Sequence, residues 1–280
     1  MKEWISPIPK TIHLIWIGNN PLPDYTKLFI QSFFDNCPEF TIKLWTESNL
    51  NSKNFPKTYK YIQEAKSYQG KPMEKTYSDT ETIHYYGKDG NMKNYSKFAQ
   101  MTDLMRLEII YNEGGFYFDT TFEILKPLYN LLNRKERFVG CNEIPRFKDF
   151  SYLSNSFFGA TKNNPILKRL LSKKYLDTID FSNPAVDNET GPGYLRRGIH
   201  LSDNYYIYPT KYFYPFVEEY SPGENPSYRK ASKNKCHSKK KKKSYKNLKN
   251  KGYISYPCTK YKESYALKHW QLGKSWIYWE

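Results

Sequence analysis

The sequence predicts an α/β fold with a mixed central sheet. A short run of β-branched and aromatic residues (11–18, TIHLIWIG) is followed by a helical pattern (23–38) and then by a second alternating run (40–46, FTIKLWT). Strand, helix and strand at this spacing form a βαβ unit, which places parallel strands at the N-terminal end of the sheet. With 39% hydrophobic and 18% aromatic residues, a chain of 280 residues can also bury a large core.

The first helix is expected to bury one stripe and to end before Pro38. That stripe consists of Leu28, Phe29, Ser32 and Phe33. Residues 51–94 are polar and mixed, so helical pieces and loops outside the sheet are expected there.

A second, longer helix is expected at 96–113, directly before Gly114-Gly115. Its apolar stripe consists of Phe98, Met101, Met105 and Ile109, widened by Leu104 and Ile110. Beyond the glycines, FYFDTTFEILKPL (116–128) is expected to form a strand pair or a strand and a loop. The later elements are expected to be strands at 137–144, 155–165 and 205–215 and an amphipathic helix at 165–179.

The positive charge of the chain is concentrated in one segment. Residues 228–262 contain 14 of the 44 Lys and Arg and no acid, which leaves 30 basic against 28 acidic residues elsewhere. This lysine-rich segment is expected to be an exposed, mobile insertion within a single 1–280 domain. It either follows a compositional bias of the whole chain or attracts an anionic membrane or acidic polymer. Nucleic acid is not expected as a partner, because aromatics are not grouped with the charges.

The four cysteines have no C-x-x-C spacing, so free thiols in a reducing compartment are expected. The first 18 residues lack the pattern of a secretory signal, and no window is apolar enough for a membrane span. The expected location is the cytoplasm, with peripheral attachment to a membrane as the alternative.

Three charged residues are expected to meet at one edge of the sheet. Asp103 and Arg106 lie three apart on the long helix and project from one face. The helix leads through the glycines into a strand that ends at Asp119. Ligands bind beyond the carboxyl ends of strands in open α/β sheets, so Asp119 is expected to face a ligand. Taken alone, Asp103 and Arg106 are equally typical of an ordinary surface ion pair.

Four segments resemble, in order, the signatures of glycosyltransferase family 32, a group of sugar transferases with a DXD motif. They are IPKTIHLIWIG (8–18), MTDLMRLEIIYNEGGFYFDTT (101–121), ETGPGYL (189–195) and HWQLGKSW (269–276). The resemblance implies a GT-A fold, which is Rossmann-like and binds nucleotide sugars. It also implies a divalent metal (manganese, or magnesium as the alternative) and transfer with retention at the anomeric carbon.

The resemblance also assigns roles to individual residues. Asp103 would hold sugar hydroxyls, and Arg106 would contact the donor with its rigid guanidinium. Tyr117 matches the aromatic residue before the first acid of the DXD motif, and Asp119 is that acid. Trp16 would lie against the nucleotide base, although the residues alone are equally compatible with a buried core tryptophan.

The motif departs from Asp-x-Asp, because Thr121 stands where the family has its second acid. A neutral hydroxyl is a poor ligand for manganese or magnesium. Metal binding would therefore depend mainly on Asp119, His269 and the diphosphate of the donor. Glu123, two residues after Thr121, is a further candidate ligand.

The last two matching segments supply the remaining candidates. Ser275 and Trp276 would donate hydrogen bonds to phosphate oxygens. In the glycine- and proline-broken segment 187–195, expected to be a loop, Glu189 is the candidate that orients the acceptor or stabilises the cationic sugar. Asp187 is the alternative carboxylate there, with helix capping by Asp187 or Thr190 as the purely structural interpretation. Asn155 is a further candidate sugar contact.

The sequence therefore predicts a retaining glycosyltransferase that moves a sugar from a nucleotide-sugar donor to a glycan or another acceptor, in surface polysaccharide or glycoconjugate synthesis. A non-catalytic nucleotide-sugar-binding relative, inactivated by the Asp-x-Thr change, is the alternative. A membrane-surface or nucleic-acid protein driven by the lysine-rich segment is the third hypothesis.

Overall fold

The computed structural model describes residues 3–18, 20–78, 81–84, 90–143, 153–214 and 263–269. The lysine-rich segment, with the expectation of mobility attached to it, lies outside these ranges. The strands are β1 (Thr11–Trp16), β2 (Thr41–Thr46), β3 (Glu74–Ser78), β4 (Glu81–His84), β5 (Gly115–Phe118), β6 (Phe122–Ile124), β7 (Phe138–Asn142), β8 (Leu153–Ala160), β9 (Tyr205–Tyr208) and β10 (Ala266–Lys268).

The helices are α1 (Asp24–Asn36), α2 (Tyr59–Ser67), α3 (Phe98–Glu113), α4 (Tyr129–Leu132), α5 (Pro165–Leu170), α6 (Lys173–Leu176), α7 (Val186–Glu189) and α8 (Pro192–Arg197), with short 3-10 turns η1 (Glu47–Asn49) and η3 (Thr210–Tyr212). Within the described ranges, no helix has the length and apolar character needed to cross a bilayer. Cys37 and Cys141, the two cysteines that these ranges contain, are buried free thiols.

The central sheet has six strands in the order β2-β1-β5-β8-β7-β9. β1 pairs in parallel with both β2 and β5, as the βαβ pattern predicts. β8 runs antiparallel to β5 and β7, and β9 is parallel to β7. The sheet is therefore mixed, and the carboxyl ends of β1, β5 and β7 lie at the same edge as the start of β8.

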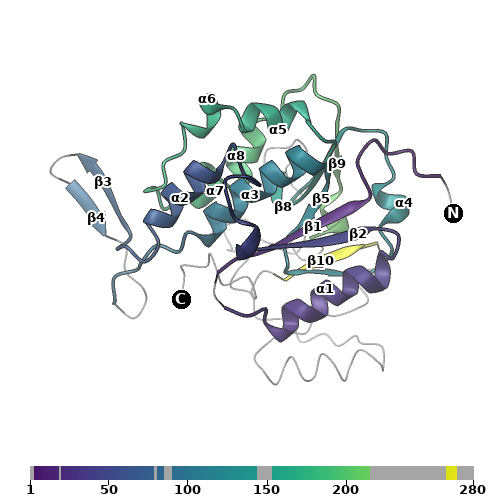
Figure 1. The fold of residues 1–280 in the computed structure, drawn as a ribbon, viewed down its shortest axis with the longest axis horizontal. Helices are drawn as coiled ribbons and strands as arrows, with labels where there is room; N and C mark the ends of the chain where they lie inside the picture. The colour runs from purple at the N-terminus through teal and green to yellow at the C-terminus, as the bar shows by residue number, and fades with distance from the viewer. Residues whose placement is uncertain are drawn as a thin grey trace.

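Helices cover both faces of this sheet (Figure 1). α3 packs on one face with α2, α5 and α8, around a cluster that includes Leu104, Ile110, Phe158 and Tyr194. α1 lies on the other face, where Phe33, Phe118 and Phe157 belong to a second cluster. Aromatic side chains dominate the second cluster, and the Phe157 and Phe213 rings stack at 4.0 Å. The two apolar clusters, one on each face, fix the position of the central sheet and of the edge where β1, β5 and β7 end.

The predicted elements of the sheet and its two main helices are confirmed, with one correction on α1. That helix ends at Asn36, just before Pro38, but it buries Thr26, Phe29 and Phe33. Leu28, expected in the stripe, is 47% exposed. α3 buries residues all around its middle turns, because it lies between the sheet and α2.

Three local expectations are wrong. The helix expected at 165–179 divides into α5 and α6, because the chain is extended at Ser172. The segment 187–195 is helical rather than a loop: α7 ends at Glu189, and α8 begins with Pro192 at its first turn, after Gly191. Residues 51–94 include the β3–β4 hairpin besides helix, and this hairpin extends away from the main sheet (Figure 1).

Gly114 and Gly115 turn the chain from α3 into β5, and both have positive φ angles, of 71° and 106°. The buried His13 side chain braces this turn, because its Nε2 lies 3.0 Å from the Gly114 carbonyl oxygen. Trp45 donates a hydrogen bond to His13 Nδ1, which leaves Nε2 as the protonated donor. Burial lowers the pKa of His13 to about 4, so the ring is neutral at pH 7.

Gly115→Ala is expected to destabilise the fold more than Gly70→Ala. Both glycines have positive φ, which costs a side-chain-bearing residue about 1–2 kcal/mol. A Cβ at Gly115 would also lie 2.6 Å from the Thr11 carbonyl oxygen, whereas one at Gly70 meets nothing within 4 Å. Urea unfolding of the two variants isolates the steric contribution, and equal losses of stability would contradict it.

Candidate active site

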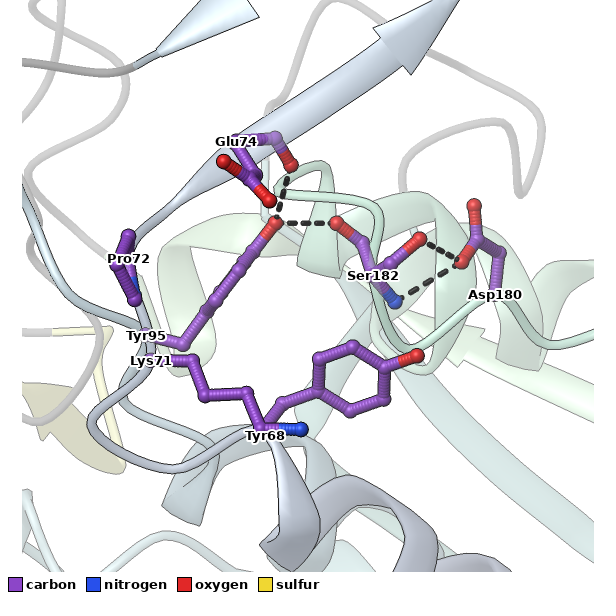
Figure 2. Close-up of a pocket in the computed structure, with 7 residues that line it drawn as sticks. All are labelled: Tyr68, Lys71, Pro72, Glu74, Tyr95, Asp180 and Ser182. Carbon is purple, nitrogen blue, oxygen red and sulfur yellow. Dashed lines mark hydrogen bonds between the residues drawn. The ribbon is translucent and has the colours of Figure 1, made fainter. Parts of the chain in front are cut away.

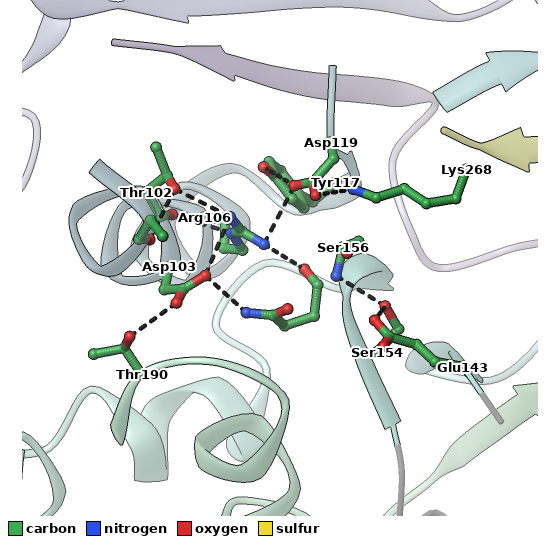
Figure 3. Close-up of polar contacts among 12 residues, drawn as sticks. Thr102, Asp103, Arg106, Tyr117, Asp119, Glu143, Ser154, Ser156, Thr190 and Lys268 are labelled. Carbon is green, nitrogen blue, oxygen red and sulfur yellow. Dashed lines mark hydrogen bonds and ion pairs between the residues drawn. The ribbon is translucent and has the colours of Figure 1, made fainter. Parts of the chain in front are cut away.

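A cluster of charged side chains lies at the carboxyl edge of the sheet, where α3 begins (Figure 3). Asp119 directly follows β5, and its backbone N–H donates to the Ser156 carbonyl of β8 at 2.9 Å. Because α3 returns to the start of β5, its N-terminal half, with Asp103 and Arg106, lies at this same edge. The three charges that the sequence predicts to meet are thus brought together.

Arg106 is the centre of the cluster. Its guanidinium donates to the Thr102 carbonyl at 3.1 Å, to the Thr102 hydroxyl at 3.1 Å and to the Asn155 carbonyl at 2.8 Å. It also pairs with Asp103 at 3.2 Å and with Asp119 at 3.4 Å. The Cζ atom of the guanidinium lies 4.4 Å from the centre of the Tyr117 ring. Arg106 is 5% exposed, so it is a buried cation shared by two carboxylates.

Asp103 is held in place from three sides. Asn155 Nδ2 donates to Oδ1 at 2.7 Å, and the Thr190 hydroxyl donates to Oδ2 at 2.8 Å. Burial raises the pKa of Asp103 to about 6, against the opposing effects of Arg106 and Thr190. Asp103 and Arg106 therefore form a buried ion pair and not an ordinary surface pair. Asn155 contacts this carboxylate, and Thr190 binds it instead of capping the next helix.

Asp119 lies between cations and a phenol. Tyr117 donates to Oδ1 at 2.7 Å, and the ammonium of Lys268 forms an ion pair with Oδ2. Burial alone would raise the pKa of Asp119, but Lys268 and Arg106 outweigh it and leave the pKa below its usual value. Asp119 is therefore a stable anion in this structure.

Lys268 was not predicted, and it reaches the cluster through a pairing of distant strands. β10 pairs antiparallel with β6, which sets Lys268 opposite Phe122. The side chain is 3% exposed, with its ammonium 5.3 Å from the Phe122 ring centre. Burial lowers the pKa of Lys268, and the ion pair with Asp119 opposes this effect. No pattern in the residues around Lys268 identifies it as a member of the cluster.

Glu143 is a second residue that the sequence did not indicate. It follows β7 at the same edge and accepts a hydrogen bond of 2.6 Å from Ser154. Ser154 is also 2.5 Å from the hydroxyl of Tyr214. Burial raises the pKa of Glu143 to about 7, although the Ser154 hydrogen bond and Lys268 act in the other direction. This carboxyl group therefore keeps its proton to a higher pH than an exposed glutamate does.

Trp16 ends β1 at the same edge and is partly exposed. Its indole N–H donates to the Asn20 carbonyl at 2.9 Å. The alternative of a fully buried core tryptophan is therefore excluded. A partly exposed indole beside the carboxyl end of a parallel strand is available to stack on a planar base.

The expected metal ligands have other partners. His269 Nε2 lies 3.1 Å from Glu123 Oε2, and its ring stacks on Phe29 with centroids 4.3 Å apart. Thr121 is 7% exposed, and its buried hydroxyl has no hydrogen-bond partner among the described residues. Those residues contain no group of three or more His, Cys, Asp or Glu that could hold a metal ion.

Glu189 binds the loop that precedes α7. Its carboxylate accepts from the Asp180 backbone N–H at 3.0 Å and from the Asn183 side chain at 2.7 Å. The next residue, Thr190, is the one that reaches Asp103. Asp187 is exposed, and its negative charge contributes to the raised pKa values of Asp103 and Glu143.

The predicted donors Ser275 and Trp276 lie outside the described residues. A separate pocket of about 280 Å³ lies beyond the N-terminal end of α3 (Figure 2). Its wall includes Tyr68 and Lys71, and the Tyr95 hydroxyl donates to the carbonyls of Glu74 and Ser182. None of the residues of the charged cluster lines this pocket.

Residues 23–139 match the model of a protein family described as a glycosyltransferase sugar-binding region containing a DXD motif. A curated toxin of Photorhabdus asymbiotica is 27% identical over 185 residues, which cover 59% of this chain and 6% of that protein. Toxin Afp18 of Yersinia ruckeri is 24% identical over 188 residues, 60% of this chain and 8% of that protein. The chain thus spans less than a tenth of the length of these curated relatives.

Solved structures similar to the chain include the PaToxG glycosyltransferase (TM-score 0.47, 18% identity, 68% of each chain). Another is the UDP-bound glycosyltransferase domain of the YGT toxin (TM-score 0.42, 11% identity, 72% of this chain and 80% of that one). The predicted α/β fold, with its mixed central sheet and covering helices, is confirmed by the structure. Residues 23–139 are thus similar to the sugar-binding region of glycosyltransferases that contain a DXD motif.

Proposed function

We propose that the chain transfers a glycosyl group from a nucleotide-sugar donor to a hydroxyl-bearing acceptor. The observation that carries this proposal is the convergence of Arg106, Lys268, Asp103 and Asp119 beside the partly exposed Trp16 at the carboxyl edge of the sheet. Such an edge is the usual place for a nucleotide in an open α/β sheet. Trp16 would stack on the base, and the charges would lie beside the diphosphate and the sugar.

The reaction requires stabilisation of opposite charges. As the bond from the sugar to the diphosphate breaks, negative charge grows on the leaving phosphate and positive charge on the sugar carbon. Arg106 and Lys268 would offset the negative charge on the phosphate, and the Asp119 carboxylate would offset the positive charge on the sugar carbon. Because hydrogen bonds and ion pairs already fix these groups, they need little reorganisation, and preorganised charge of this kind is usually the largest catalytic contribution.

Transferases with a DXD motif typically use a divalent metal together with the nucleotide sugar. When bound, such a metal neutralises the diphosphate. In this structure Asp119 is engaged by Lys268, Thr121 offers only a hydroxyl, and His269 contacts Glu123. The described residues therefore do not fit a divalent ion at Asp119.

The finer parts of the proposal are retention at the anomeric carbon and the identity of the acceptor. Retention and a role in surface polysaccharide or glycoconjugate synthesis derive from the family resemblance of the sequence. The curated relatives are named toxins, which favours instead an acceptor on a macromolecule foreign to the cell that makes the enzyme. Product analysis with labelled donor distinguishes the two classes of acceptor.

Donor binding is expected to need Trp16. A selective nucleotide sugar at about 100 times its Kd should stabilise the wild-type protein by about 2.7 kcal/mol in a thermal-shift panel. Trp16→Ala should lose most of this stabilisation, because stacking on a base contributes about 1–3 kcal/mol. Phe34→Ala, at an aromatic residue of α1 that is 52% exposed, is the matched control and should keep it.

The same panel tests the function itself. Binding followed by donor hydrolysis or transfer supports the enzyme. Donor binding without turnover of any common nucleotide sugar would favour the non-catalytic relative. If no nucleotide sugar stabilises the protein, the proposed function is wrong.

A further inference from the structure

We propose that the ammonium of Lys268 takes the place of the divalent metal, so that the chain binds and turns over its donor without one. This inference rests on the proposed function and names the cation that faces the diphosphate. It starts from the Lys268–Asp119 ion pair at the carboxyl edge of the sheet, between β10 and the end of β5 (Figure 3).

The charges of the motif support the replacement. Thr121 removes one negative charge from the position of the second acid, and Lys268 adds one positive charge beside the first. Compared with an Asp-x-Asp site that lacks the lysine, this edge is two charges more positive. Two charges are also what a divalent ion would contribute, so the same diphosphate is neutralised by protein groups alone.

The ion-pair geometry supports it as well. The Lys268 side chain is held on Asp119 and is 3% exposed, so the ammonium is preorganised. Arg106 pairs with the other oxygen of Asp119 at 3.4 Å. A second cation is therefore already next to the carboxylate, and a divalent ion there would be repelled by both.

The environment of Thr121 points the same way. Its hydroxyl is buried without a partner among the described residues, beside the strand that carries Lys268. The Thr121 carbonyl accepts from the His269 backbone N–H at 3.0 Å, which ties the motif to the segment after β10. The hydroxyl can donate to a phosphate oxygen, a role open to a neutral donor and closed to a carboxylate.

The test measures binding of UDP and of GDP by calorimetry, with EDTA and with manganese. The wild-type protein should bind one of them with Kd values that differ by less than about threefold between the two conditions. Lys268→Met should weaken this binding about 10- to 100-fold, as expected for loss of a charge-assisted hydrogen bond, and manganese should not restore it. Lys268→Arg should retain most of the affinity, and Lys168→Met, at an exposed lysine of α5, should retain all of it.

A double variant tests the replacement in the reverse direction. Thr121→Asp with Lys268→Met restores two acids and removes the ammonium, so its diphosphate binding should become dependent on manganese. When this variant is added to a mixture of Mn²⁺ and the nucleotide, the electron paramagnetic resonance signal of free Mn²⁺ should fall further, and addition of the wild-type protein should not lower it. Urea unfolding confirms that each variant is folded.

Each outcome has one meaning. Wild-type binding that disappears in EDTA and returns with manganese overturns this inference and leaves the proposed function intact. Undiminished binding by folded Lys268→Met also overturns it. If the wild-type protein binds neither nucleotide under either condition, the proposed function fails and this inference fails with it.

Discussion

Replacing Arg106 by methionine is expected to cost about 3–5 kcal/mol of folding stability. The substitution keeps an unbranched apolar stem but removes the cation between Asp103 and Asp119, both of which are paired with it in the structure. It also leaves the Asn155 carbonyl without its 2.8 Å donor. Since domains have only about 5–15 kcal/mol in total, urea unfolding should show a large shift of the midpoint.

Two matched variants make this prediction specific. Arg106→Lys keeps the charge but loses the planar fork that reaches several acceptors at once, so it should lie between wild type and Arg106→Met. Arg137→Met should change stability by less than about 0.5 kcal/mol, because this arginine is exposed. If Arg106→Met is as stable as Arg137→Met, Arg106 does not hold the cluster together.

Glu143→Gln is expected to stabilise the protein at pH 8 and to have little effect near pH 4. Burial raises the pKa of Glu143 in the folded protein to about 7, from its ordinary value of 4.5. The folded state therefore binds the proton more tightly, and this contribution to stability is complete below pH 4.5 and is lost as the pH rises through 7. The difference amounts to about 3 kcal/mol. Glutamine cannot ionise and avoids the loss.

The comparison must be made as a difference between variants, because other groups titrate in the same range. His13 has a lowered pKa of about 4, and its contribution to stability has the opposite sign, increasing as the pH rises from 4 to 6.5. The His13 contribution cancels when the free energy of unfolding of Glu143→Gln is subtracted from that of wild type at each pH. For Glu64→Gln, at an exposed position of α2, the difference in free energy of unfolding from wild type should not change with pH. A Glu143→Gln variant less stable than wild type at pH 8 would show that the carboxylate is needed in its charged form.

The elements that depend on local pattern could be predicted from the sequence. β1, α1, β2 and α3 follow from periodicity, from Pro38 and from the glycine pair. The position of Asp119 at the end of β5 follows from the same order of elements. The signal for α8 was present as well, because Pro192 after Gly191 is a common helix start, but the glycines in this segment favoured a loop.

The rest of the site depends on contacts between distant parts of the chain. Lys268 reaches Asp119 only because a three-residue strand pairs with β6, and no local pattern identifies that register. Glu143 follows an ordinary strand, and its raised pKa results from burial beside Ser154 and Tyr214. Likewise, the family resemblance assigns Glu189 to the site, but its carboxylate is bound by the loop before α7.

The pairing of β6 with β10 has a consequence for synthesis of the protein. Lys268 follows Asp119 by 149 residues. At about 5–20 residues per second, a ribosome needs roughly 7–30 s to make that stretch. During this interval the growing chain lacks the cation that pairs with Asp119 in the folded protein, so chains interrupted before residue 268 would lack this ion pair.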